Sequence, residues 1–162
     1  MLSNALQNGF NEQIQKEFYS SYLYLAMAAH FEAANLPGFA SWMKKQSDEE
    51  RGHAMKLWDY VYDRGGKVEL SAIEQPPVAF GKPLEVFEQV LEHEQKVTAS
   101  INTLYGLAAK DADVAAEIFL QWFVTEQVEE EKSVTDVIAQ LKMSGDNGFA
   151  ALFVDKHILG QR

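Results

Sequence analysis

The sequence predicts an all-α protein in which four long helices form a bundle, with a short fifth helix at the C-terminal end. Apolar residues recur at helical spacing over four long stretches, and the strongest turn signals fall between those stretches. One Pro-containing connection is long enough to run the whole length of such a bundle. We expect residues 1–162 to form a single domain.

The first predicted helix begins at Ser3, a suitable N-cap, and ends near Ala34. The short break "ANLPGF" follows, and the second helix then continues to Gly65 and Gly66. So short a break predicts an antiparallel hairpin of two helices. The stripe expected to be buried on the first helix consists of Leu6, Phe10, Ile14, Phe18, Leu25 and Ala29.

A connection from Lys67 to Lys82 separates this hairpin from a second one. At ~3.3 Å per residue its reach matches a helix of about thirty residues, so it can cross the bundle from end to end. Pro83 suits the first position of the third helix, which ends near Lys110. The fourth helix begins near Asp113 and ends at "SGDNG", and the fifth begins at Asp146. The apolar positions expected to line these last two helices are Val114, Ile118, Trp122, Val134, Val137, Ile138 and Leu141, then Phe149, Leu152, Phe153 and Ile158.

The charge balance of the chain restricts the classes of molecule that it can bind. Its 14 basic and 24 acidic residues give a net charge of −10, the wrong sign for binding nucleic acid through phosphates. The absence of Cys leaves His, Asp and Glu as the strong metal ligands. We find neither a signal peptide nor an apolar stretch long enough to cross a membrane, and we therefore expect a cytoplasmic protein.

Glu50 and His53 stand three residues apart on the second predicted helix, so both side chains lie on one face and can converge on one ion. A carboxylate with an imidazole suits iron, zinc or manganese. Taken alone, the pair is more typical of a solvated acidic helix face. The other three long helices, however, carry acids at about the same height, as judged from ~1.5 Å per residue. These partners are Glu17, Glu94 and the group Glu126, Gln127, Glu129 and Glu130.

Carboxylates gathered at one level of a bundle core repel one another and are costly to desolvate, so a metal cluster would stabilise them. Tyr24 follows Glu17 by two helical turns on the same face, and its ring should lie near this cluster. Its phenol could donate an electron or a hydrogen bond there. A core tyrosine that simply binds a carboxylate explains the same spacing equally well.

Four separated motifs resemble the bacterial non-haem ferritins in order and spacing: "NEQIQKEFYSSYLYLAMAAHFE", "DEERGHAMKL", "LEHEQKVT" and "FLQWFVTEQVEEEKSV". The resemblance covers essentially the whole chain. It implies a ferritin-like four-helix bundle that stores iron, with one long crossover between the second and third helices. It also implies a ferroxidase that oxidises Fe(II) with O2 or hydrogen peroxide and keeps Fe(III) as a hydrated oxide inside a shell of twenty-four subunits.

The same resemblance implies roles for individual residues. Glu17, Glu50 and His53 would form the first iron site, and Glu50 would bridge to a second site completed by Glu94 and Glu130. Gln127 would lie beside the oxygen-binding region, and Tyr24 is associated with iron oxidation. A third iron site would use Glu49, Glu126 and Glu129, sharing Glu130.

The general ferritin-like pattern places one Glu on each of two helices and a Glu-x-x-His pair on each of the other two. Here Gln127 and Glu130 replace the second pair, which makes the second site poorer in nitrogen and suits a centre that passes iron onward. Bacterioferritins place a haem-binding Met between the Glu and His of the first pair; Arg51 and Gly52 stand here, so no haem is expected. The alternative is a non-enzymatic structural or signalling four-helix bundle whose acids only decorate its surface.

Overall fold

The computed structural model describes residues 1–145 and 147–160, with side chains placed to residue 158. Those residues form helices and no strand, which confirms the predicted all-α class. The start proposed for the fifth helix, Asp146, lies outside the described residues. The helices are α1 (Asn4–Ala33), α2 (Pro37–Asp63), α3 (Pro83–Lys110), α4 (Val114–Ser144) and α5 (Gly148–Gly160).

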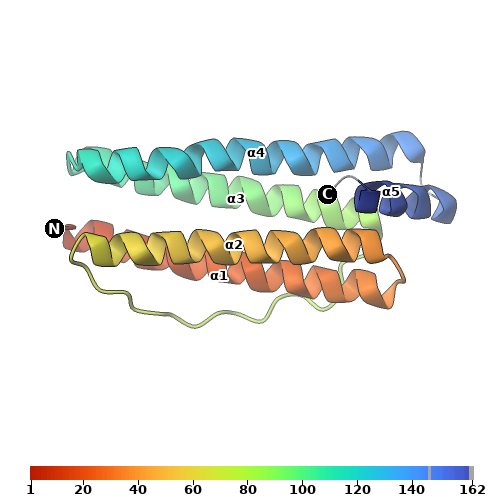
Figure 1. Cartoon of the computed structure of the whole chain (residues 1–162), viewed down its shortest axis with the longest axis horizontal. Coiled ribbons are helices and arrows are strands. Elements are labelled where there is room, and N and C mark those ends of the chain that lie inside the picture. Colours follow the sequence, from red (N-terminus) through yellow and green to blue (C-terminus); the bar gives the residue numbers. More distant parts are fainter. Residues whose placement is uncertain (146, 161–162) are drawn as a thin grey trace.

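Two antiparallel hairpins, α1–α2 and α3–α4, make up the bundle (Figure 1). The connection between α2 and α3 runs back along the first hairpin, so α3 begins at the end of the bundle where α2 begins (Figure 1). Side chains of α1 hold this crossover in place: Asn11 donates to Lys67 O (3.1 Å) and Gln15 to Ala72 O (3.2 Å). The predicted long crossover is therefore confirmed.

The predicted capping residues occupy the helix ends. Ser3 Oγ accepts a hydrogen bond from Leu6 N (3.1 Å) and Asp113 Oδ1 accepts one from Ala116 N (3.1 Å), so each satisfies a backbone N–H that has no partner within its helix. Pro83 is the first residue of α3, where its missing N–H costs nothing. These local signals explain why the helix boundaries could be predicted closely.

The buried face of α1 differs from the predicted stripe. Leu25 is 47% exposed, Ala29 is exposed and Phe18 is only half-buried. Leu6, Phe10 and Ile14 are buried, as predicted. Each step of four residues turns about 40° too far on a helix of 3.6 residues per turn, so the later predicted positions rotated out of the interface. The residues that are buried on α1 keep closer to the true period, and the middle of their face is polar: Leu6, Phe10, Gln13, Ile14, Glu17, Ser20, Leu23, Tyr24, Met27, Ala28 and Phe31.

The same drift affects α4, where Val114, Ile118 and Trp122 are 64%, 63% and 38% exposed instead of buried. Its buried face runs through Leu120, Phe123, Gln127, Glu130, Val134, Val137, Ile138 and Leu141, so the C-terminal half of the prediction is correct.

The last helix, α5, packs against the N-terminal end of α2 through a buried carboxylate. Asp155 is 2% exposed and its Oδ1 accepts a hydrogen bond from Phe39 N (2.8 Å), which caps α2 from outside that helix. A Cβ on Gly38 would lie 1.9 Å from Asp155 O, so only Gly allows this approach. Ile158 is buried against the bundle, whereas Phe149 and Phe153 are 81% and 61% exposed.

Two apolar clusters fill the bundle interior, one toward each end. The first includes Leu23, Phe39, Phe87 and Val134, and the second includes Phe10, Leu57, Ile101 and Phe123. Both leave out the buried acids and amides near the middle of the long helices. The apolar core is thus interrupted by a polar layer at mid-height, which is where the sequence placed its candidate site.

Candidate metal centre

Each long helix contributes a buried polar side chain to this mid-height layer. Glu17 of α1 is 1% exposed, Glu50 of α2 is 0% exposed and Glu94 of α3 is 0% exposed. His53 of α2 and Glu130 of α4 are each 6% exposed. Acids are very rarely buried to this degree without a compensating partner. The surface-decoration alternative is therefore wrong for these residues.

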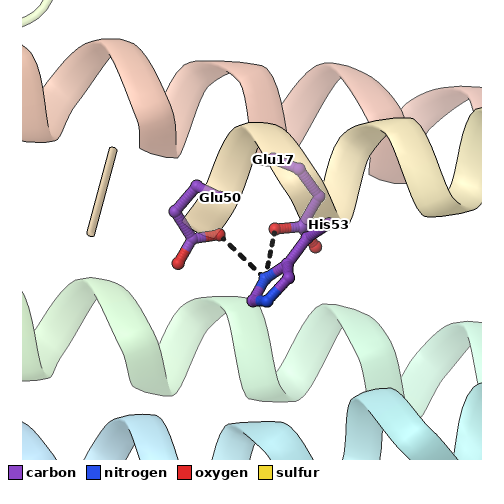
Figure 2. Close-up of side chains that lie close together, drawn as sticks. All are labelled: Glu17, Glu50 and His53. Atoms are coloured by element: carbon purple, nitrogen blue, oxygen red, sulfur yellow. Dashed lines mark ion pairs between the residues drawn. The ribbon is translucent and has the colours of Figure 1, made fainter. Parts of the chain in front are cut away.

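The first hairpin brings three ligand-type groups together (Figure 2). His53 Nδ1 lies 3.3 Å from Glu50 Oε2 and 3.9 Å from Glu17 Oε2. One ligand atom from each residue falls within 4.8 Å of the other two. Glu50 and His53 share a face of α2 because they are three residues apart, and α1 supplies Glu17 from across the hairpin (Figure 2).

The second hairpin holds its carboxylates differently, with hydrogen-bond donors already in place. The hydroxyl of Tyr24 donates to Glu94 Oε1, and Gln127 Nε2 donates to Glu94 Oε2 (3.2 Å). Gln46 Nε2 donates to Glu130 Oε2 (2.7 Å). The predicted position of Tyr24 beside the cluster is confirmed, and its hydroxyl binds a carboxylate.

Burial dominates the electrostatics of the centre. It raises the pKa of Glu17 and Glu50 well above the ordinary Glu value, and the neighbouring carboxylates Glu50 and Glu94 respectively add to this effect. Burial also raises the pKa of Glu94, and it raises that of Glu130 to about 7. The site therefore favours any species that removes the mutual repulsion of these acids, either a shared proton or a cation.

A divalent cation fits the unused atoms of the first hairpin. Glu17 Oε2 and both oxygens of Glu50 are buried without a hydrogen-bond partner, which is costly unless something else satisfies them. Three carboxylate oxygens beside an imidazole nitrogen form a donor set suited to iron, zinc or manganese. These residues thus fit a metal on the evidence of their own geometry.

A second group of possible ligands overlaps the first. His53, Glu126 and Glu130 also place one ligand atom each within 4.8 Å of one another. The Trp122 ring meets the imidazole edge-on, with ring centroids 5.4 Å apart, and so limits how the His53 side chain can turn. His53 consequently lies between two groups of acids, one from each hairpin.

The remaining predicted ligands lie farther out. Glu49 has a side chain that is 39% exposed, and its Oε1 lies 3.8 Å from Lys45 Nζ. It nevertheless adds to the repulsion felt by Glu50 and Glu130. Glu129 is exposed on α4. Of the acids predicted for a third iron site, the structure brings only Glu126 and Glu130 into one candidate ligand group within the described residues.

Two buried amides, Gln13 and Gln46, were missed by the sequence reasoning. Each is 1% exposed, and each donates to a carboxylate of the centre: Gln13 to Glu17 Oε1 (2.7 Å) and Gln46 to Glu130 Oε2. A signal for them existed, because each stands four residues before a candidate ligand on the same helix face, at Glu17 and Glu50.

A four-helix bundle with one long crossover and buried Glu and His ligands at mid-height defines the ferritin-like class of di-metal carboxylate proteins. Comparison with known proteins agrees with this class. Residues 7–144 match the family described as the ferritin-like domain.

Relatives and solved structures identify the family to which the chain belongs within this class. A bacterial non-heme ferritin of Bacteroides fragilis is 47% identical over 162 residues, covering all of both chains, and one of Staphylococcus aureus is 37% identical over 158 residues, covering 98% of this chain and 95% of that one. The open-pore ferritin of Archaeoglobus fulgidus superposes with a TM-score of 0.97 at 44% identity, with both chains fully covered. The chain belongs to the bacterial non-haem ferritins. It is an iron-storage protein with ferroxidase activity.

Among the described residues, no helix has both the length and the apolar character needed to cross a membrane.

Proposed function

We propose that iron is oxidised at the mid-height layer, with Glu17, Glu50 and His53 as the first iron site and Glu94 and Glu130 as the second. Glu50 would bridge the two ions, because both of its oxygens are buried and free of hydrogen bonds. The single observation that carries this assignment is the set of orphaned oxygens beside His53, since a bound cation would satisfy all of them and relieve their mutual repulsion.

The residues account for the chemistry that ferroxidation needs. Two ferrous ions each give up one electron, and O2 takes both with two protons to form hydrogen peroxide; peroxide in turn takes two electrons and two protons to form water. The negative carboxylates stabilise Fe(III) more than Fe(II) and so favour electron loss. Gln127, which already bonds to Glu94, and Tyr24 lie where a hydrogen bond to the reduced oxidant is within reach.

Release of ferric product would proceed toward a third iron site. We place Glu126 there with Glu130, joined by Glu49 and Glu129 from the more exposed positions beside them. A second site poor in nitrogen retains iron weakly, which supports transfer onward. No haem is part of the proposal, because exposed Arg51 and Gly52 stand between Glu50 and His53.

Storage requires an enclosed space, and we propose a shell of twenty-four copies located in the cytoplasm. A single bundle has no room for a mineral, whereas a symmetric shell encloses one. The exposed Phe149 and Phe153 on α5 support burial between copies, since large apolar side chains at a surface mark contact sites. Sedimentation of the purified protein measures the number of subunits, and a monomer at micromolar concentration would contradict the shell.

The decisive experiment is a ferrous titration that follows ferric absorbance and oxygen uptake together. We expect Glu50→Ala and His53→Ala to oxidise iron no faster than buffer, because each removes a ligand of the first site. Glu12→Ala, which removes an exposed acid of α1, is the matched control and should behave as the parent. If both site variants oxidise and store iron at the parental rate, the assigned centre is wrong.

A further inference from the structure

A chain of hydrogen bonds joins the protein surface to the metal ligand Glu17. Lys16 Nζ donates to Ser100 Oγ (2.7 Å), Ser100 Oγ donates to Gln13 Oε1 (2.6 Å), and Gln13 Nε2 donates to Glu17 Oε1 (2.7 Å). Lys16 is exposed, Ser100 is half-buried and Gln13 is buried, so the chain crosses from solvent into the bundle.

The two charged ends of this hydrogen-bond chain set the direction of the bonds between them. An ammonium group only donates, so Ser100 must accept from Lys16 and has its single proton left for Gln13. At the inner end the carboxylate of Glu17 only accepts, so Gln13 turns its amide N–H toward Glu17 and presents its carbonyl oxygen to the proton of Ser100. The exposed lysine thus supports the amide orientation that the ligand carboxylate also requires.

These hydrogen bonds leave Glu17 with one oxygen that is available to bind an ion. Oε1 accepts from Gln13, while Oε2 has no partner and lies 3.9 Å from His53 Nδ1. A carboxylate held in this way offers an ion one oxygen and is hindered from turning to chelate it with two. Groups that bond to metal ligands commonly set ligand orientation in this manner.

We propose that Gln13, Ser100 and Lys16 are positioning residues that hold Glu17 in a one-oxygen binding mode for the first iron. This inference rests on the proposed first site of Glu17, Glu50 and His53. The outer end opens into a hollow of about 480 Å³ between α1, α3 and the crossover, lined by Lys16, Ser100, Tyr19, Glu74, His93 and Lys96. Substitutions at the exposed end can therefore interrupt this series of hydrogen bonds without changing any of the proposed metal ligands.

Anaerobic titration with cobalt(II) alone tests the proposal, because its visible spectrum reports the coordination number and calorimetry gives its dissociation constant. We expect Ser100→Ala to weaken binding of the first ion about tenfold, the lower end of the range for groups that orient ligands. Its spectrum should lose intensity, because a freed Glu17 can bind through both oxygens and raise the coordination number. Ser100→Thr keeps the hydroxyl and should restore both properties.

Two controls match these changes elsewhere in the bundle. Thr103→Ala removes a hydroxyl from the exposed side of α3 that bonds to Ala99 O of its own helix, and it should leave both readouts at the parental values. Lys16→Met should weaken binding less than Ser100→Ala, by about threefold, since the Ser100 to Gln13 bond remains. Lys132→Met removes an equal charge from α4, where Lys132 pairs with Asp136, and should change neither readout.

The outcomes separate this inference from the proposed site. If His53→Ala binds cobalt(II) as tightly as the parent, the first site itself is misassigned. If His53→Ala binds weakly while Ser100→Ala matches Thr103→Ala, the site stands and the positioning role is wrong. Circular dichroism checks that Ser100→Ala folds; should it not fold, the exposed pair Lys16→Met and Lys132→Met decides, and equal binding by those two overturns the proposal.

Discussion

The two hairpins bury their acids in different ways. In the α1–α2 half, Glu17 Oε2 and both oxygens of Glu50 have no hydrogen-bond partner. In the α3–α4 half, Tyr24 and Gln127 take both oxygens of Glu94, and Gln46 takes one oxygen of Glu130. Burial is equally deep on both sides, so the difference lies in the donors that surround the acids.

This contrast indicates an order of filling. A cation entering the first half gains ligands without breaking any hydrogen bond, because those oxygens are unused. A cation entering the second half must displace or share the bonds that Tyr24 and Gln127 make to Glu94. One buried cluster therefore contains a half whose unpaired oxygens are open to an ion and a half in which Glu94 is already hydrogen-bonded on both oxygens.

The largest expected effect comes from removing one ligand from each half. Glu17→Ala should abolish tight binding of both ions, because the first site fills first and Glu50 alone cannot hold it with His53. Glu94→Ala should leave binding of the first ion within about threefold of the parent and remove the second, since the first half is already formed. Calorimetric titration with zinc(II), with Glu12→Ala as control, counts the ions; equal losses in both variants would contradict the ordered filling.

The second-largest expected effect is a pH dependence of the free energy of unfolding, which arises from Glu130. Its pKa is about 7 in the folded protein against an ordinary value of 4.5, so between these values the unfolded chain is ionised while the folded protein holds the proton. Stability from this group is complete below pH 4.5 and is lost as pH rises through 7, by about 3 kcal/mol per subunit.

We expect Glu130→Gln to remove this part of the pH dependence in the metal-free protein. Chelator-treated parent and variant are unfolded with denaturant at a fixed protein concentration between pH 4.5 and 8, because oligomer stability depends on concentration. Saturating zinc(II) should reverse the trend in the parent, since the ion replaces the proton. Parallel curves for the metal-free parent and variant would show that Glu130 titrates normally.

A smaller effect is expected for Tyr24→Phe, which removes the donor to Glu94 Oε1. The metal-free protein should lose about 1–3 kcal/mol of stability, because a buried oxygen is left unpaired. Binding of the second ion should instead become roughly threefold to tenfold tighter, since one hydrogen bond no longer competes with it. The control is Tyr22→Phe, on an exposed face of α1. Weaker binding of the second ion in Tyr24→Phe would refute the competition between Tyr24 and metal.

The smallest effect concerns Thr98, whose Oγ1 accepts a hydrogen bond from Gln127 Nε2 (3.2 Å). Thr98→Val should change the affinity for the second ion by no more than about threefold, because the Gln127 amide keeps its bonds to Glu94. Zinc(II) titration beside Thr135→Val, an exposed threonine of α4, measures the difference. A change in affinity larger than that caused by Tyr24→Phe would mean that Thr98, and not Tyr24, controls Glu94.

Much of the fold could be predicted because its signals are local. Ser3, Pro83 and Asp113 mark helix starts through chemistry that acts within a single turn, and the connection is long enough to span the bundle. The buried faces were harder. Steps of four residues looked regular in sequence, yet their drift carried Leu25 and Ile118 to the surface.

The candidate site, like the fold, was predictable only where local spacing determines it. Glu50 and His53 were predictable because a spacing of three fixes them on one helix face, and helix length placed Glu17 and Glu94 at their height. Which oxygens stay free was not predictable, because it depends on donors from other helices. Gln46 reaches Glu130 across 84 positions of sequence, and Tyr24 reaches Glu94 across 70.

The sequence by itself therefore determined the helices, their caps, the crossover and the level at which the acids gather, since each follows from local periodicity and residue chemistry. Only the tertiary structure decided that Gln13 faces Glu17 with its amide N–H, that Glu94 is bonded on both oxygens, and that those of Glu50 are left free. Hydrogen bonds between side chains on different helices depend on rotation and register, and these are set only when the helices pack.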